Sequence, residues 1–290
     1  MSVTRGKPSG WVLVALVMGV GAIAVAVLYA LAVEPNWIQV TEVEIGLNDL
    51  PRSFDGYRVA LMGDFHVGGP WPGALWRVRQ AVKKVNRAAP DLVLLAGDFL
   101  YRSTQKFDEC VKEIQKLHPP DRVLAVLGNH DYWVDAERVR SGLQSNSIEL
   151  LTDGGGSRTI ERNGVRLWFV GIDDLWTCQP NLEEVFRDVP LGEAVIALSH
   201  NPDVAPLVPN GAVGLVLAAH TQGGQVWLPG IGAPEVPSRF GERYRCGLVR
   251  EGGLQVYVTR GVGMIYPPVR FLCRPEVTII TLRAKKAGAR

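Results

Sequence analysis

The chain opens on an uninterrupted apolar run and then alternates short apolar segments with amphipathic ones. Residues 11–33 carry no charged side chain and are long enough to cross a bilayer, which takes about 20 residues. Arg5 and Lys7 precede this run, and acidic residues outnumber basic ones directly after it. The basic excess on the N-terminal side predicts a cytoplasmic N-terminus over residues 1–10, a single-pass anchor and an extracytoplasmic remainder.

A cleaved signal peptide is the alternative reading of this run, since Ala30, Leu31 and Ala32 have the small-x-small form of a cleavage site. The apolar core of a signal peptide is usually only about 7–15 residues long. The longer uncharged run therefore favours an anchor that stays attached.

The first half of the remaining chain alternates strand and helix patterns. Amphipathic segments predict helices over 72–88, 106–117 and 134–144. Short apolar segments predict strands over 41–47, 57–62, 92–96 and 122–127. This alternation indicates a sheet with a parallel portion and covering helices.

The second half is richer in strands. Asn163-Gly164 lies between two β-rich segments, 157–161 and 165–171, and is typical of a tight hairpin. A short helix is expected near 182–187, and further strands over 194–199, 213–219, 225–228, 245–250, 255–259 and 277–282. The whole pattern predicts an α/β fold: a two-sheet β-sandwich flanked by helices over residues 34–283, followed by a basic tail over 284–290.

The composition excludes some classes of protein. With 47% hydrophobic residues, 21% charged residues and a net charge of +2 in 290 residues, the chain reads as globular, and a nucleic-acid partner is not expected. None of the four cysteines forms a CxxC pair, which argues against a zinc knuckle. A bridge between Cys246 and Cys273 stays open for a domain outside the cytoplasm.

Polar residues of ligand type follow the predicted buried strands again and again. They are Asp64 and His66, Asp98, Asn129 and His130, His200, and His220. One such residue is usually a turn former or a helix cap. However, four of the five histidines occupy these positions, which favours one shared site at the strand ends.

Carboxylate, imidazole and amide oxygen together form a mixed ligand set that suits Mn, Fe or Zn. Two such ions about 3.5–4 Å apart can activate a hydroxide, orient a phosphate and neutralise its developing charge. A site with this donor set can therefore support phosphoryl hydrolysis if it holds two such ions.

At these motifs the chain resembles the calcineurin-like metallophosphoesterases, most of all their membrane-associated bacterial branch. The family pattern is D-x-H, G-D, G-N-H-(D/E), a lone H and G-H-x-H. Here it reads, in order, Asp64-x-His66, Gly97-Asp98, Gly128-Asn129-His130-Asp131, His200 and Ala219-His220-Thr221-Gln222. Five ordered motifs make the resemblance specific, and it extends over nearly the whole chain after the anchor. It implies a bacterial inner (cytoplasmic) membrane location.

The resemblance also implies roles for individual residues. Asp64 and His66 would bind the first metal, Asp98 would bridge both, and the second would be bound by Asn129, His200 and His220. His130 would remain unligated near the phosphate and protonate the leaving oxygen.

Two departures from the family pattern bear on these roles. Gln222 stands where the last metal ligand is normally histidine, and an amide oxygen is a weaker donor than imidazole. Tyr101 stands where several members carry an aspartate that orients the catalytic histidine, so His130 is expected either to rely on another partner or to act less as an acid. Asp131 is expected to be structural, and Asp173 and Asp174 are expected to form a turn, with a position at the rim of the cleft as the alternative.

The resemblance and the anchor together predict a phosphodiester, phosphomonoester or pyrophosphate substrate that is lipid-linked or near the membrane. Tryptophans after the metal motifs, such as Trp133 and Trp176, form an apolar rim in this reading, although core packing explains them equally well. Pyrophosphate hydrolysis of a UDP-2,3-diacylglucosamine-type lipid A precursor is an alternative that requires the opposite topology. A metal-poor, membrane-bound scaffold or binding protein is the other alternative, supported only by Gln222 and Tyr101.

Overall fold

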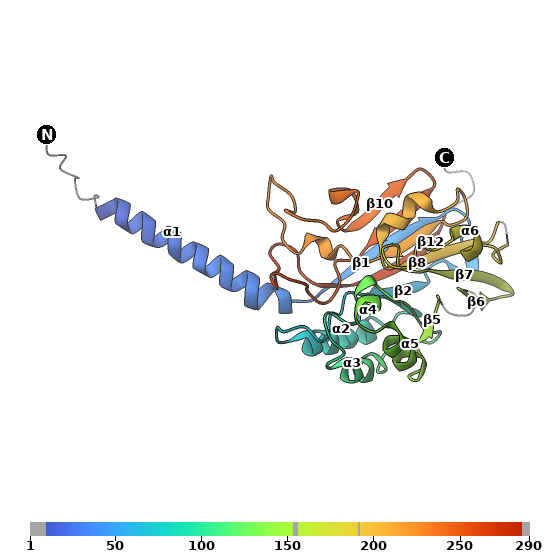
Figure 1. Ribbon diagram of the computed structural model, residues 1–290. Coiled ribbons are helices and arrows are strands. Elements are labelled where there is room, and N and C mark those ends of the chain that lie inside the picture. The colour runs from blue at the N-terminus through green and yellow to red at the C-terminus, as the bar shows by residue number, and fades with distance from the viewer. Residues whose placement is uncertain (1–9, 153–155, 191, 286–290) are drawn as a thin grey trace.

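Two mixed β-sheets of six strands each face one another in the computed structural model, which describes residues 10–152, 156–190 and 192–285. Helices cover the outer side of the first sheet, and one long N-terminal helix projects away from the domain (Figure 1). The two-sheet sandwich flanked by helices is therefore confirmed.

The first sheet is ordered β1-β12-β2-β3-β4-β5. β12 runs parallel to β1 but antiparallel to β2, while β2, β3, β4 and β5 run parallel to one another. Its strands are β1 (Gln39–Leu47), β2 (Arg58–Met62), β3 (Leu92–Ala96), β4 (Val123–Val126), β5 (Glu149–Leu150) and β12 (Glu276–Ala284).

The second sheet is ordered β10-β11-β9-β8-β7-β6. β7, β8, β9 and β11 are parallel, and the antiparallel pair β6/β7 is the hairpin expected at Asn163-Gly164, with Arg162 opposite Val165. Its strands are β6 (Ser157–Arg162), β7 (Val165–Ile172), β8 (Ala194–Ser199), β9 (Leu215–Ala218), β10 (Gly247–Glu251) and β11 (Leu254–Val258).

Apolar side chains form three buried clusters. One lies between the two sheets, and one lies on the outer face of each sheet. Leu61, Leu94 and Phe169 belong to the fully buried cluster between the sheets. The amphipathic helices bury their apolar sides on the outer face of the first sheet, as the 3.6-residue period predicts. They are α2 (Ala74–Ala88), α3 (Phe107–Ile114) and α5 (Ala136–Gln144).

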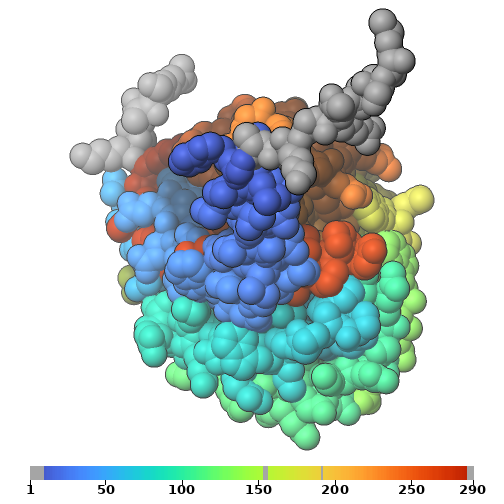
Figure 2. Space-filling view, turned by 90° about the vertical axis from the view of Figure 1, so that its left-hand side faces the viewer, coloured from blue at the N-terminus to red at the C-terminus, as the bar shows by residue number. Residues whose placement is uncertain are grey.

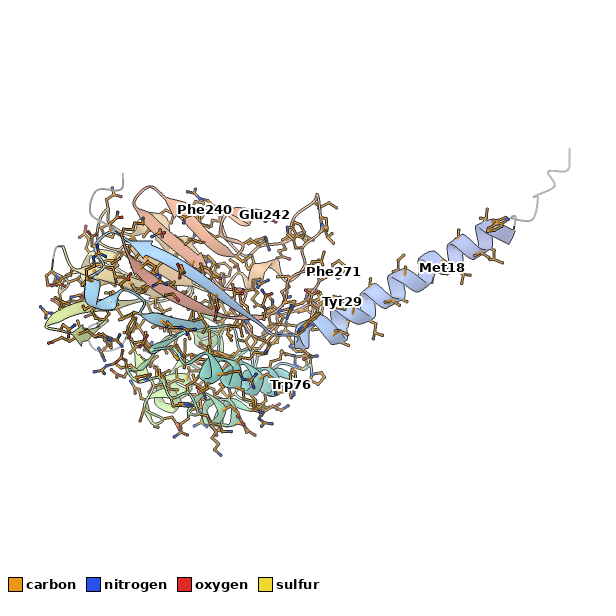
Figure 3. All side chains as sticks on the ribbon, turned by 180° about the vertical axis from the view of Figure 1, so that it is seen from behind. Met18, Tyr29, Trp76, Phe240, Glu242 and Phe271 are labelled. Carbon is orange, nitrogen blue, oxygen red and sulfur yellow. The ribbon has the colours of Figure 1, made fainter. Side chains whose placement is uncertain are left out.

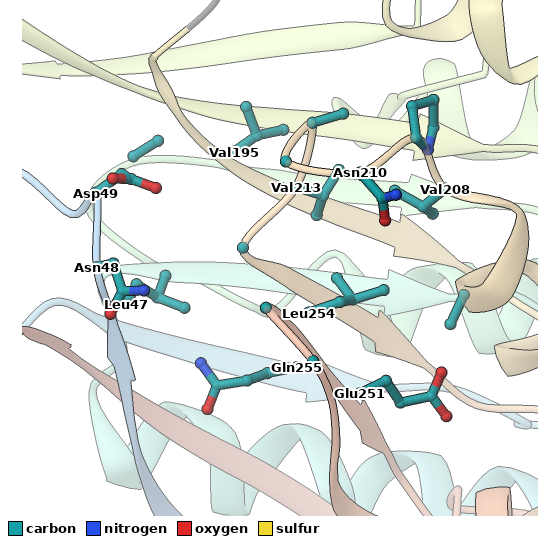
Figure 4. Close-up of a pocket in the computed structure, with 18 of the residues that line it drawn as sticks. Leu47, Asn48, Asp49, Val195, Val208, Asn210, Val213, Glu251, Leu254 and Gln255 are labelled. Atoms are coloured by element: carbon teal, nitrogen blue, oxygen red, sulfur yellow. The ribbon is translucent and has the colours of Figure 1, made fainter. Parts of the chain in front are cut away.

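The strand directions bring the carboxyl ends of β2, β3 and β4 to the same end of the sandwich as the N-terminal helix. β1 and β12 begin at that end, and β2 runs against β12, so β2, β3 and β4 finish there. At the opposite end, a cavity of about 560 Å³ opens between the end of β1 at Leu47 and the start of β11 near Gln255 (Figure 4). No strand-end histidine lines that cavity.

The apolar run forms α1 (Gly10–Leu28), continued by one wider turn over Tyr29–Val33 and a short turn over Glu34–Asn36. With a mean hydropathy of 2.7 and no buried residue in its most apolar window, this helix is long and apolar enough to cross a membrane. The strand expected over 225–228 was wrong, because that segment forms only two isolated bridges, Val226 with Phe271 and Leu228 with Gly232. Cys246 and Cys273 are free thiols, so the bridge between them is absent.

Candidate metal centre

The loops that follow five strands bring the predicted ligands together at one edge of the sandwich. Asp64 and His66 follow β2, Asp98 follows β3, Asn129 and His130 begin α4 (Asn129–Val134) after β4, and His200 and His220 follow β8 and β9. Several of these residues have left-handed backbones, with φ of +52° at Asp64, +55° at Asp98 and +69° at His220. Such conformations are unfavourable outside glycine and concentrate where a site fixes its side chains.

Asp98 lies at the centre of the cluster. Its Oδ2 is 3.5 Å from Nε2 of His66 and 3.2 Å from Nε2 of His200, and its Oδ1 accepts the backbone N–H of His130 at 2.9 Å. Burial alone would raise the pKa of Asp98, but the positive charge of His200 outweighs burial and holds that pKa well below its usual range. Gly128 leaves room for the carboxylate of Asp98, since a Cβ at residue 128 would lie 2.2 Å from its Oδ1.

His66 and Asp64 form one side of the cluster. His66 Nδ1 is 3.2 Å from the carbonyl of Leu100, and burial lowers the pKa of His66 to about 3, so its ring is neutral and Nε2 offers a lone pair. Asp64 Oδ1 lies 3.8 Å from that nitrogen. Desolvation raises the pKa of Asp64 to about 7 despite the charge of His200.

His200, Asn129 and His220 form the other side. His200 Nδ1 is 2.7 Å from the carbonyl of Ala96, which orients the ring. Its Nε2 lies 3.1 Å from both Oδ1 of Asn129 and Nδ1 of His220. Burial lowers the pKa of His200, but the carboxylates around it, Asp98 first, outweigh burial and raise that pKa to about 10.

Several hydrogen-bond acceptors of this cluster have no partner among the described residues, and this favours the binding of cations. Both carboxylate oxygens of Asp64, Nε2 of His220 and Oε1 of Gln222 are buried without a hydrogen-bond partner in the described chain. Leaving the oxygens of Asp64 and Gln222 uncompensated is unfavourable, and a divalent cation beside them would satisfy them. His66, Asp98 and His130 form one possible metal group, and Asp98, His200 and His220 a second, with ligand atoms within 4.8 Å in each.

His130 is oriented by a partner that the sequence did not suggest. Its Nδ1 is 3.0 Å from the backbone carbonyl of Tyr101, and the two rings stack with centroids 5.2 Å apart. Tyr101 thus supplies through its main chain the orienting contact expected from a carboxylate. Since a carbonyl is neutral, it fixes the ring of His130 without adding negative charge.

Asp131, Asp173 and Asp174 have the structural contacts that the sequence suggested. Asp131 accepts the backbone N–H groups of Leu100 and Gly128 at 2.9 and 3.0 Å, which ties the loops after β3 and β4 together. Asp174 closes a turn by accepting N–H groups of Trp176 and Thr177.

Two exposed tryptophans border the cluster. The ring of Trp133 is 58% exposed and lies 4.9 Å from the ring of His130. Trp176 is 42% exposed and meets His220 edge-on at 4.4 Å. Trp133 and Trp176 stack on each other with centroids 6.4 Å apart. Because both side chains are exposed, packing in the hydrophobic core does not account for their positions.

One wall of the site had no motif to reveal it. The segment after β11 passes so close to Asp64 that a Cβ at Gly261 would lie 2.4 Å from its Oδ2. Gly263 donates its N–H to the carbonyl of Asp64 at 2.6 Å. The closely spaced glycines in the sequence RGVGM were the only available signal.

Gln222 faces the cluster, since its Nε2 lies 2.8 Å from Nε2 of His66 and its Oε1 has no partner. We expect Gln222→His to tighten metal binding at the side of Asp64 and His66 by about tenfold, because imidazole is a better donor than an amide. Histidine also tolerates the left-handed backbone at this position, where φ is +49°. Competitive titration with a metallochromic chelator measures the change.

The matched control for that titration is Gln225→His, a nearby buried glutamine whose side chain binds loop backbone groups of Ile265 and Pro267 instead. An unchanged titration for Gln222→His would show that residue 222 does not contribute to the metal site.

Comparison with known proteins adds an independent finding. The model of the calcineurin-like phosphoesterase family matches residues 57–223. The chain is 30% identical to the uncharacterized metallophosphoesterase YkuE of Bacillus subtilis, over 88% of this chain and 89% of that protein. It is also 30% identical to the phosphodiesterase YaeI of Escherichia coli, over 86% and 90% of the two chains.

A transmembrane protein with a metallophosphoesterase domain from Danio rerio is 30% identical over 90% of this chain and 61% of that protein. Among solved structures, a dimetal phosphatase from Danio rerio has a TM-score of 0.44 and 14% identity, over 72% of this chain and 88% of that one.

Proposed function

The chain belongs to the calcineurin-like phosphoesterase family and is a hydrolase, and we propose that it is membrane-anchored and cleaves a lipid-linked or membrane-near phosphoester at the strand-end cluster. The observation that carries this proposal is the convergence of buried carboxylate, imidazole and amide groups around Asp98, several of whose acceptor atoms have no hydrogen-bond partner among the described residues. Phosphodiesters, phosphomonoesters and pyrophosphates all present the anionic oxygens that such a site recognises.

The residues divide into two ligand sets that share one carboxylate. Asp64, His66 and Gln222 would hold the first cation, Asp98 would contact both, and the second would be held by Asn129, His200 and His220. Two such cations supply Lewis acidity, lower the pKa of a bound water and neutralise charge on the phosphoryl group. Mn, Fe and Zn all suit this donor set.

His130 is placed to handle the proton of the leaving group. Its backbone N–H is held by Asp98 and its Nδ1 faces the carbonyl of Tyr101, so Nε2 is left for the substrate side. A histidine fixed in this way can protonate the departing oxygen, which is worth about 10²–10⁴ in rate.

The apolar helix supports the anchored arrangement. Residues 11–33 would cross the bacterial inner membrane, with residues 1–10 in the cytoplasm, residues 34–283 folded outside it and 284–290 as a basic tail. The exposed Trp133 and Trp176 beside the cluster support a substrate with an apolar portion, such as a lipid-linked phosphoester.

Metal analysis of the purified full-length chain tests the proposal. We expect close to two equivalents of divalent metal per chain and hydrolysis of bis(p-nitrophenyl) phosphate, both lost on chelation and both restored by adding metal back. A chain with neither metal nor activity would instead be the metal-poor scaffold.

A further inference from the structure

No spacer separates the apolar helix from the catalytic domain. The backbone N–H of Arg270 donates to the carbonyl of Ala30 at 3.0 Å, inside the last apolar turns. The ring of Tyr29 meets Phe271 edge-on at 6.4 Å. The two residues that follow the apolar run, Glu34 and Pro35, are already buried in the domain. We call the point where the helix leaves the domain the exit. The domain surface around the exit must therefore lie directly against any membrane that the helix crosses.

Buried Glu34 holds an exposed apolar turn beside the exit. Its carboxylate accepts the backbone N–H of Leu272 at 2.9 Å and that of Cys273. Leu272 has a left-handed backbone, with φ of +51°, and its side chain is 49% exposed. A left-handed backbone is unfavourable for leucine, and so is an apolar side chain in water, so this turn points to a function at the surface.

Further exposed apolar side chains surround the same point. We call this group the anchor-side patch, and it consists of Trp37, Trp76, Ile231, Tyr266 and Leu272. Figure 3 shows Trp76 and Phe271 close to the base of the helix, and Figure 2 shows the helix emerging between the cyan and the orange-red residues of the domain.

Hydrogen bonds fix the members of the patch beside the exit. Trp76 lies in the first turn of α2, and the adjacent Arg77 donates to Asn36, which in turn donates to the carbonyl of Ala32 at 2.8 Å. Ile231 is in a tight turn that runs beside Phe271, where Trp227 donates its N–H to the Phe271 carbonyl at 2.9 Å.

The segment that meets the anchor is also a wall of the metal centre. The guanidinium of Arg270 is fully buried and donates to the carbonyls of Gly263 and Gln222 at 2.8 and 3.3 Å. Gly263 in turn holds the backbone of Asp64. Tyr266, which belongs to the patch, donates its N–H to the hydroxyl of Tyr101. The loop 260–273 thus carries two residues of the patch, Tyr266 and Leu272, and also contacts the backbone of the cluster at Asp64 and Gln222.

We propose that the anchor-side patch docks on the bilayer surface and holds the metal-bearing edge of the domain against the lipid headgroups. This rests on the proposed membrane anchor. Tryptophan and tyrosine favour the membrane–water interface, and the patch is continuous with the apolar helix. Arg274, whose guanidinium lies 4.0 Å from the ring centroid of Trp37, adds a cation at headgroup level. A lipid phosphoester then reaches the site without leaving the bilayer.

Spin labels on the full-length chain in lipid nanodiscs test the orientation. The labels would be attached at Tyr266→Cys, Leu272→Cys and Val20→Cys, in a background where the two partly exposed cysteines, 178 and 246, are serine. Leu207→Cys is the matched control, since Leu207 is equally apolar and exposed but lies beside the cavity at the opposite end of the domain. Relative accessibility to oxygen and to a soluble nickel chelate reports the depth of each label.

We expect bilayer-core depth at position 20, headgroup depth at 266 and 272, and a fully aqueous signal at 207. In the same nanodiscs, Trp76→Ser with Ile231→Ser, two exposed patch residues outside the loop 260–273, should raise KM for a bilayer-embedded phosphodiester at least fivefold and leave hydrolysis of bis(p-nitrophenyl) phosphate unchanged. Aqueous signals at 266 and 272 with a buried label at 20 would overturn the docking and leave the anchor standing. An aqueous label at 20 would overturn the anchor itself, and the docking with it.

Discussion

Replacing Asp98 by asparagine is expected to lower kcat/KM for phosphodiester hydrolysis by at least about 10³-fold, since metal-ion catalysis supplies several kcal/mol and each 1.36 kcal/mol is a factor of ten. Asp98 lies within 3.5 Å of imidazole nitrogens on both sides of the cluster, so among the described residues it is the carboxylate placed to serve both of the proposed cations. The amide is nearly isosteric and its oxygen can still accept the N–H of His130. The loss would therefore come from the missing charge.

Metal content measured beside the kinetics separates this cause from misfolding. The variant should bind fewer than two equivalents of metal while circular dichroism stays unchanged. Asp108→Asn is the matched control, because Asp108 is an exposed carboxylate that pairs only with Arg138 on the surface, and it should leave both quantities unchanged. Full activity in Asp98→Asn would contradict the bridging role.

Replacing His130 by glutamine is expected to lower kcat by about 10²–10⁴-fold for substrates whose leaving group is a poor one, such as an alkyl alcohol. The reason is that an alkoxide must be protonated as it departs, whereas p-nitrophenolate leaves readily without help. The decrease should therefore be small for bis(p-nitrophenyl) phosphate. Steady-state kinetics with a series of aryl and alkyl esters measures this dependence.

His118 provides the control for His130. It is exposed, and its Nδ1 lies 3.0 Å from the backbone carbonyl of Lys116, away from the candidate metal ligands, so His118→Gln should leave kcat unchanged for every ester. Metal content should stay near that of the unmodified chain in His130→Gln if the residue is unligated. Loss of a metal equivalent would show instead that His130 is a ligand, as its place near His66 and Asp98 allows. An equal loss of kcat for all leaving groups would contradict the proton-donor role.

The convergence of the candidate metal ligands could largely be predicted from the sequence, because each of these residues follows a buried strand directly. Strand ends are visible as apolar segments, and parallel strands finish at one edge, so the order of the motifs already implied convergence. The structure brings Asp64, His66, Asp98, His200 and His220 together as expected. The hairpin at Asn163-Gly164 was equally local and equally predictable.

The hydrogen-bond partner of His130 could not be predicted from the sequence in the same way. The sequence showed only that Tyr101 replaces a possible carboxylate, which made the histidine look unsupported. Every residue carries a backbone carbonyl, and side-chain chemistry does not tell which carbonyl a ring will meet. The loop after β3 had to be folded before Nδ1 of His130 could be placed against Tyr101.

The sequence by itself determined the apolar helix, the two-sheet α/β fold and the ligand types, because each depends on a local pattern of side chains. Only the tertiary structure decided that the helix, the loop 260–273 and the edge with the candidate metal ligands share one end of the domain. The contact of Arg270 with Ala30 and the direction of β2 against β12 join segments that are hundreds of residues apart. Such contacts follow from packing of the whole chain, so no local pattern could carry them.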